Sequence, residues 1–317
     1  MSLAADALQP RLVKSLLSLS GRAEACHLAD IVTSAGAGFD LDFDAAALKI
    51  LLDFREPTYL GQKIGGDASR FASAAFVSMH QLDAAVSDAS TVAWSLIRLY
   101  YAGFYAGHAV LRFLGESCSY LDSGHVSKIR DLGIARSNPS PFPLSAGAYH
   151  LVLTPEQTGI DLVKAGTRNG GAHEIFWDIL DEFLKRASAA AMLGHLTPDD
   201  GKAVFLKLEA FRDITKRSAG ASWLSAVRNE IQYRHDRGVW TPATVNRSGR
   251  ATLARLSRQW ARDPMKIDLE LPPGGDLGRF VAACAFLVAL CRSVLGRIAD
   301  RSSAGNRSFA RVPLQLS

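Results

Sequence analysis

The sequence has few residues of the kinds that usually reveal a familiar chemistry. Its 317 residues include four cysteines, Cys26, Cys118, Cys284 and Cys291, and no two of them form a Cys-x-x-Cys pair. This spacing excludes the common zinc clusters built from paired cysteines. Buried core thiols in a reducing compartment fit such sparse usage.

Several catalytic motifs are also absent. No HExxH, no GxSxG and no P-loop motif occurs, which excludes the zinc proteases, the α/β-hydrolase nucleophile elbow and the Walker-type nucleotide site in their usual forms. The glycines of "PGGDLGRF" and "TRNGGAH" indicate helix starts. Six further histidines lack ligand spacing: His27, His80, His125, His150, His173 and His195. We therefore expect no metal and no cofactor.

The sequence shows no pattern of export or membrane insertion. The first residues, "MSLAADALQPRLVKSLLSL", lack a charged start followed by a sustained apolar run. No stretch reaches the roughly 18 uninterrupted apolar residues of a membrane span. We therefore expect a cytoplasmic protein without a signal peptide. The formal net charge of +5 permits a nucleic-acid partner but does not require one.

What the sequence does contain is helical periodicity over an apolar core. Hydrophobic residues make up 48% of the chain, enough to bury a sizeable core. Helical spacing begins at Ser69, and "STVAWSLIRLYYAGFYAGHAVLRFLG" is apolar or aromatic almost all round. A helix of that kind is buried on most sides. The fold class expected is mainly α, a helical bundle over residues 69–300.

Three segments interrupt or flank this bundle. Residues 1–68 are expected to be an N-terminal extension with short helices at 1–20 and 45–55. Residues 116–172 are expected to be an insertion of loops, with a β-hairpin in "YHLVLTPEQTGIDLVKAG". Residues 301–317, rich in serine and arginine, are expected to be a flexible basic tail.

One short segment, "SWLSAVRNEIQYRHDRGVW", concentrates hydrogen-bonding and titratable side chains. Arg228 and His235 are separated by six residues. At about 100° per residue, a continuous helix places both on one face, about 10 Å apart along its axis. Arginine binds a phosphate with a fork of donors, and histidine transfers protons near neutral pH. The pair therefore suits cleavage of an RNA phosphodiester, in which the 2′-OH is the nucleophile. Two copies facing each other would supply both a base and an acid.

A structural interpretation of the segment stays open. Its polar side could face solvent, with His235 stabilising the helix C-terminus through the helix dipole. A second polar stripe lies on the expected central helix, and it too fits either aromatic packing or the border of a phosphate site. The stripe comprises Trp94, Arg98, Tyr101, Tyr105, His108 and Arg112. Gly103 and Gly107 on the same helix would let another backbone approach closely.

Taken together, the two helices resemble those of the HEPN superfamily (higher eukaryotes and prokaryotes nucleotide-binding). One family helix commonly reads like "YYAGFYAGHAVL", Tyr100 to Leu111, and a later helix carries arginine, a polar residue and then histidine. Arg228, Asn229 and His235 stand at those places. The resemblance covers about residues 69–300, with the insertion at 116–172 and the N-terminal extension as departures from a compact bundle.

The resemblance implies a metal-independent endoribonuclease that acts as a homodimer on RNA. Such proteins often serve as toxins or anti-phage defence effectors, held in check by an antitoxin or another partner protein. Arg228 would hold the scissile phosphate, His235 would be the general acid or base, and Asn229 would orient either group. Arg234, Arg98 and Tyr101 are candidate RNA contacts. The alternative is a non-catalytic helical module that binds nucleic acid, a nucleotide or a partner protein as a scaffold.

Overall fold

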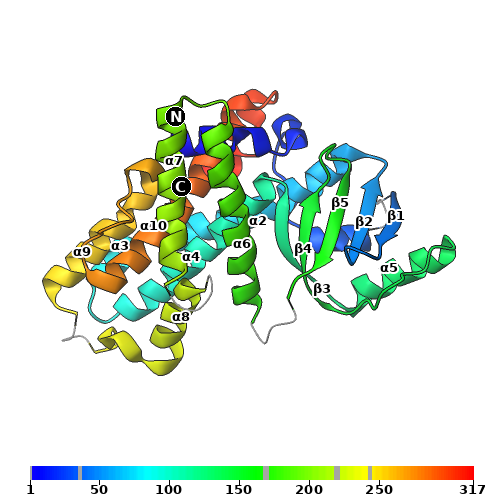
Figure 1. Ribbon diagram of the computed structural model, residues 1–317. Helices are drawn as coiled ribbons and strands as arrows, with labels where there is room; N and C mark the ends of the chain where they lie inside the picture. Colours follow the sequence, from blue (N-terminus) through cyan, green and yellow to red (C-terminus); the bar gives the residue numbers. More distant parts are fainter. Residues whose placement is uncertain (1, 35–37, 167–170, 218–221, 242–244) are drawn as a thin grey trace.

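A computed structural model describes residues 2–34, 38–166, 171–217, 222–241 and 245–317. The fold is mainly helical, with one five-stranded antiparallel sheet placed beside the helices (Figure 1). The α-helices are α1 (Leu3–Leu8), α2 (Pro57–Met79), α3 (Leu82–Ser87), α4 (Val92–Phe113), α5 (Ser123–Ala135), α6 (Ala172–Leu193), α7 (Pro198–Thr215), α8 (Trp223–Asn229), α9 (Arg247–Ser257), α10 (Gly275–Arg301) and α11 (Arg311–Leu314).

Helix α4 forms the centre of the bundle, as its uniformly apolar sequence predicts. It packs between α2 and α10, and α6 and α8 also contact it. Two glycines allow this close packing. A Cβ at Gly103 would lie 3.2 Å from the Cα of Cys284 in α10, and a Cβ at Gly107 would lie 2.7 Å from the ring of Phe176 in α6. The expected close approach of another backbone is confirmed at Gly103, whereas the neighbour at Gly107 is a side chain.

Helix α10 is the one described helix that is long and apolar enough to cross a membrane. Most of it lies inside the bundle, against α4, α9 and α1. A buried core helix meets the same criteria of length and composition as a membrane span.

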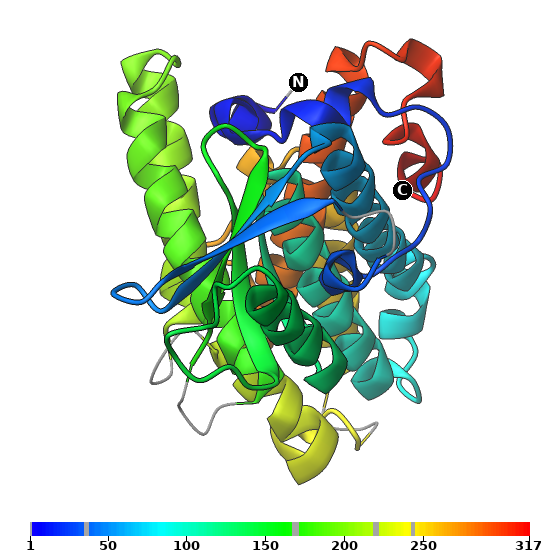
Figure 2. The ribbon, with the colours of Figure 1, turned by 90° about the vertical axis from the view of Figure 1, so that its right-hand side faces the viewer.

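The sheet has the strand order β1-β2-β5-β4-β3. Its strands are β1 (Phe39–Asp44), β2 (Lys49–Phe54), β3 (Glu116–Leu121), β4 (Gly147–Leu153) and β5 (Gly159–Lys164). Viewed from the sheet side, the strands cross in front of the helices (Figure 2). The hairpin expected in this region is confirmed, because β4 and β5 pair with Tyr149 opposite Lys164. Strands β3 and β4 contact α6, and α5 packs on β1 and β3.

The helix expected over residues 45–55 is wrong, because this region contains strand β2. Ile50, Leu52 and Phe54 are buried, while Leu51 and Asp53 between them are more exposed. That period of two is the pattern of a strand with one buried face. The leucines also fit a short helical stripe, and pairing of Leu51 with Asp161 in β5 decides between the two.

The expected boundaries also change. Residues 1–68 are not a separate extension, because β1 and β2 belong to the same sheet as the inserted strands, and α2 begins at Pro57. The tail at 301–317 is packed rather than flexible. Phe309 is 1% exposed, and Ser308 forms a β-bridge with Ser20. The apolar side chains of the tail outweigh the serines and arginines that suggested mobility.

A buried ion pair ties α2 to α4. The Asp67 carboxylate lies 2.5 Å from Nε of Arg112 and 2.6 Å from a terminal nitrogen of Arg70. Burial raises the pKa of Asp67, but the two arginines outweigh it and hold that pKa below its ordinary value. Arg112 also donates to the carbonyls of His108 and Cys118, where β3 follows α4.

We expect Asp67→Ala to lower the free energy of unfolding by about 3–5 kcal/mol, because it leaves the buried Arg112 without its counterion. Asp40→Ala is the control, since the Asp40 side chain is exposed and its pairs with Arg55 and Arg136 are each worth less than about 1 kcal/mol. Urea titration of both variants measures the difference. Equal losses would mean that the buried pair contributes no more than a surface pair.

Candidate functional site

The segment that carries the arginine–histidine motif does not form one continuous α-helix. Helix α8 ends at Asn229, and the chain continues as a π-helical turn, η4 (Glu230–Arg234), and a 3₁₀ turn, η5 (Asp236–Gly238). His235 lies between them with φ 54°, in the left-handed region. A π turn closes hydrogen bonds five residues apart instead of four, so the regular spacing that places both residues on one face ends at Asn229.

Arg228 is buried and surrounded by aromatic rings. Arg228 is only 5% exposed to solvent. Its guanidinium carbon lies 5.2 Å from the ring centre of Tyr100, 5.7 Å from that of Tyr101 and 5.8 Å from that of Tyr233. One terminal nitrogen donates to Gln232 at 3.3 Å and to the Tyr233 hydroxyl at 3.5 Å. The Nε atom has no hydrogen-bond partner among the described residues.

The counterions distinguish Arg228 from the other buried arginines. Three arginines of the described chain are buried: Arg112, Arg212 and Arg228. Arg112 pairs with Asp67, and Arg212 pairs with Asp181 at 2.8 Å and with Glu209 at 2.6 Å. No carboxylate within the described ranges pairs with Arg228. Cation–π contacts are worth about 0.5–2 kcal/mol each, whereas burying a charge costs several. The site of Arg228 is therefore suited to receive an anion.

Tyr100 contacts Arg228 through its ring and a histidine through its hydroxyl. The hydroxyl lies 2.9 Å from Nδ1 of His173, at the start of α6, and accepts a hydrogen bond from Nε1 of Trp177 at 3.1 Å. Burial raises the pKa of Tyr100, and contacts with Trp177, Ser225 and Arg228 act against that rise. Figures 1 and 2 place α8 and the start of α6 at the same end of the bundle.

His173 is held neutral at physiological pH. Its ring packs 4.4 Å from the ring centre of Phe104. Burial, followed by the positive charge of Arg228, lowers its pKa to about 4. Sequence reasoning missed this residue, because its partners come from α4 and α8. The available signal was its position two residues after "GG", at a helix start.

The other expected site residues fall in different surroundings. Tyr101 contacts Arg228, as above, while Asn229 is half-buried and Arg234 is exposed. Arg98 does not join this site. Its Nε donates to the carbonyl of Ser78 at 2.7 Å and another nitrogen donates to that of His80, so it stabilises the end of α2.

His235 is exposed and packs on Trp240, not beside Arg228. The two ring centres lie 5.3 Å apart, and Trp240 in turn contacts Trp94 of α4 at 5.2 Å. Two contacts fix the loop that carries it. Nε1 of Trp240 donates to the carbonyl of Ile231 at 2.6 Å, and Arg237 donates to Glu230 at 2.6 Å. The loop therefore presents His235 outward.

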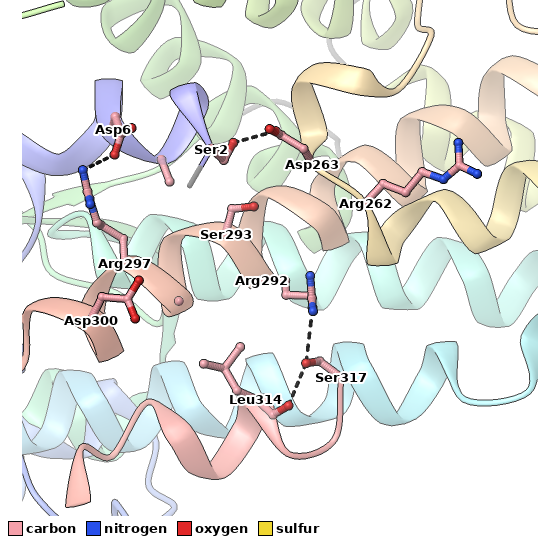
Figure 3. Close-up of a pocket in the computed structure, with 12 residues that line it drawn as sticks. Ser2, Asp6, Arg262, Asp263, Arg292, Ser293, Arg297, Asp300, Leu314 and Ser317 are labelled. Atoms are coloured by element: carbon pink, nitrogen blue, oxygen red, sulfur yellow. Dashed lines mark hydrogen bonds and ion pairs between the residues drawn. The ribbon is translucent and has the colours of Figure 1, made fainter. Parts of the chain in front are cut away.

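A cavity of about 530 Å³ over α10 differs from the surroundings of Arg228, because several of its charged side chains are paired (Figure 3). Arg297 pairs with Asp6, Ser2 donates to Asp263, and Arg292 contacts Ser317. Acidic and basic side chains balance around this cavity, and its lining includes no residue of the motif segment. Within the described residues, no three His, Cys, Asp or Glu side chains form a metal-binding group.

Comparisons with protein-family models, curated proteins and solved structures gave no match. A function is therefore inferred from the residues around Arg228 and His235 alone.

We expect Arg228→Met to leave the free energy of unfolding unchanged or to raise it, because a buried charge without a carboxylate is replaced by an apolar side chain. Arg212→Met is the matched comparison. It leaves the buried Asp181 with Lys216 alone, 3.0 Å away, takes the arginine from Glu209 as well, and should cost about 3 kcal/mol. Urea unfolding of both variants measures the contrast. Similar large losses would make Arg228 a structural residue and argue against an anion site.

The low pKa of His173 predicts a pH dependence of stability. Between an ordinary pKa of about 6.5 and the folded value of about 4, the unfolded chain takes up a proton that the folded chain does not. Stability should therefore fall as the pH falls through that window. The drop in Tm from about pH 7 to about pH 5 should be smaller for His173→Gln than for the unaltered protein. An equal drop in both would contradict the burial of a neutral His173.

Proposed function

We propose that the protein is a metal-independent endoribonuclease. The observation that supports this proposal is the buried guanidinium of Arg228, which has no carboxylate partner among the described residues and an Nε without a hydrogen bond. A phosphodiester of RNA supplies the missing negative charge. Arginine is the side chain best suited to bind it, because its planar donors match two phosphate oxygens.

The proposed reaction is an internal transesterification. The 2′-OH attacks the adjacent phosphorus, the bond to the 5′ oxygen breaks, and the products are a 2′,3′-cyclic phosphate and a 5′-OH. Arg228 stabilises the extra negative charge on the phosphorane oxygens. His235 takes the 2′ proton or gives one to the leaving oxygen. Asn229 orients the phosphate or Arg228, and Arg234 and Tyr101 contact the RNA. Arg98 is left out, because its nitrogens bind the end of α2.

The exposed position of His235 supports a dimer as the active form. One chain offers one such histidine, and its ring contacts Trp240 rather than the surroundings of Arg228. A second copy placed across this surface would bring its own His235 to the phosphate held by Arg228. A toxin or anti-phage defence effector, controlled by an antitoxin or another partner protein, is the setting we propose from the resemblance.

Because His235 lies away from Arg228 within one chain, a second candidate function is a non-catalytic module. If no second copy brings a histidine to Arg228, the site would bind a phosphate of nucleic acid or of a nucleotide without cleaving it. The protein would then act as a scaffold.

RNA cleavage in EDTA tests the proposal. Purified protein should release fragments that end in 2′,3′-cyclic phosphate. His235→Ala should slow cleavage by about 10²–10⁴-fold and Arg228→Met by about 10²–10³-fold, because they remove proton transfer and charge stabilisation. His195→Ala, which alters an exposed histidine outside the site, should cleave normally.

Retained cleavage in the His235 or Arg228 variant would contradict the assignment. Binding of RNA without cleavage by the unaltered protein would favour the non-catalytic module.

A further inference from the structure

The hydrogen-bonding register of the segment after α8 decides which side chain lies beside Arg228. At about 100° per residue, a continuous α-helix would place His235 about 20° from Arg228 around the axis, and Tyr233 about 140° from it. The observed π turn reverses this choice. Tyr233 lies beside Arg228, with its hydroxyl 3.5 Å from a guanidinium nitrogen, whereas His235 packs on Trp240.

Tyr233 covers the guanidinium of Arg228 in the observed register. Of the three tyrosines around Arg228, Tyr100 is buried, Tyr101 is half-buried and Tyr233 is 68% exposed. The ring centre of Tyr233 is 5.8 Å from the guanidinium carbon, so this exposed ring lies between Arg228 and solvent. An RNA phosphate therefore reaches Arg228 when the ring of Tyr233 moves aside.

Two hydrogen bonds hold the π register. The backbone N–H of His235 donates to the carbonyl of Glu230, five residues earlier. In an α-helix it would donate to the carbonyl of Ile231, four residues earlier. That carbonyl accepts instead from Nε1 of Trp240 at 2.6 Å. The indole of Trp240 therefore competes for the acceptor that an α-helix through His235 would use.

The backbone of the same segment is strained. His235 has φ 54° and Arg237 has φ 70°, both in the left-handed region, which costs free energy for residues other than glycine. Side-chain bonds oppose the release of this strain, because Arg237 donates to Glu230 at 2.6 Å and to Asp276 at 3.3 Å. Continuing α8 through His235 would relieve the strain at that residue. Such strain gathers in segments that change conformation, and π turns are frequent at functional sites.

We propose that residues 230–238 switch between two registers, an inactive π register that covers Arg228 and an active α-helical register that exposes it. In the active register Tyr233 leaves the face of Arg228 and His235 joins that face. Binding of an RNA phosphate favours this register, because the phosphate replaces the contacts of Arg228 with Tyr233 and Gln232. The second copy of the proposed dimer then supplies the other proton-transfer group. This inference rests on the roles proposed for Arg228 and His235.

Trp240→Phe is the variant that tests the switch. It keeps an aromatic ring against Trp94 and His235 but removes the indole donor from the carbonyl of Ile231. Backbone scalar couplings measured by NMR give the sign of φ at His235, which should be positive in the unaltered free protein. In Trp240→Phe the population with negative φ and the rate of RNA cleavage should both rise about tenfold, the effect of losing one hydrogen bond.

Two further variants accompany this measurement. Trp260→Phe is the matched control, because its ring stacks on Phe76 outside the segment, and it should behave like the unaltered protein. Glu230→Gln weakens the ion pair with Arg237 without touching the aromatic rings, and it should change φ at His235 in the same direction as Trp240→Phe. A positive φ retained at His235 in both Trp240→Phe and Glu230→Gln would overturn the inference.

Single-stranded RNA with 2′-O-methyl groups tests the ligand, because it presents phosphates but lacks the nucleophile. Added in excess to the unaltered protein, it should turn φ at His235 negative, and Arg228→Met should abolish that change. A positive φ that this RNA leaves in place would contradict the proposed coupling between phosphate and register.

The outcomes separate the switch from the proposed nuclease activity. Negative φ at His235 in Trp240→Phe, in a protein that cleaves no RNA, would support the switch and refute the nuclease. Cleavage that depends on Arg228 and His235, with no gain in Trp240→Phe and φ at His235 positive throughout, would support the nuclease and refute the switch.

Discussion

The burial of α4 is the constraint on which the rest of the structure depends. Gly103 lets α10 approach it, and Gly107 makes room for a ring of α6. A helix enclosed in this way must satisfy its polar groups internally, because an unpaired buried group costs free energy. Arg112 does so through Asp67. The Tyr100 hydroxyl does so through His173 and Trp177, which places a histidine beside Arg228.

The buried arginines of the described chain fall into two kinds, those paired with carboxylates and one that is not. Arg112 and Arg212 have carboxylates at hydrogen-bonding distance and connect helices. Arg228 has aromatic faces, an amide and a hydroxyl around it, and none of these offsets a full positive charge. Natural proteins keep such destabilising arrangements where function needs them. An anion from outside the chain is the partner that we propose for Arg228.

Sequence periodicity predicted the helices well where apolar residues surround the whole helix, as in α4 and α10. It failed at residues 45–55, where Leu51 and Leu52 fit both a helix and a strand, and pairing with β5 decided for the strand. It also separated residues 1–68 from the insertion, although β2 and β5 are neighbours in one sheet. The spacing of residues can indicate a strand, but it does not tell which distant segment the strand pairs with.

For the candidate site, the sequence by itself determined that Arg228 and His235 lie close together in the chain and that α4 carries a polar aromatic stripe. Local spacing suffices for this, because helical geometry repeats. Only the tertiary structure decided that Arg98 stabilises the end of α2, that His235 turns outward against Trp240, and that Tyr100 contacts both His173 and Arg228. These outcomes depend on which helix ends meet and on where the π turn ends regular α-helical geometry. Both follow from packing across the whole chain.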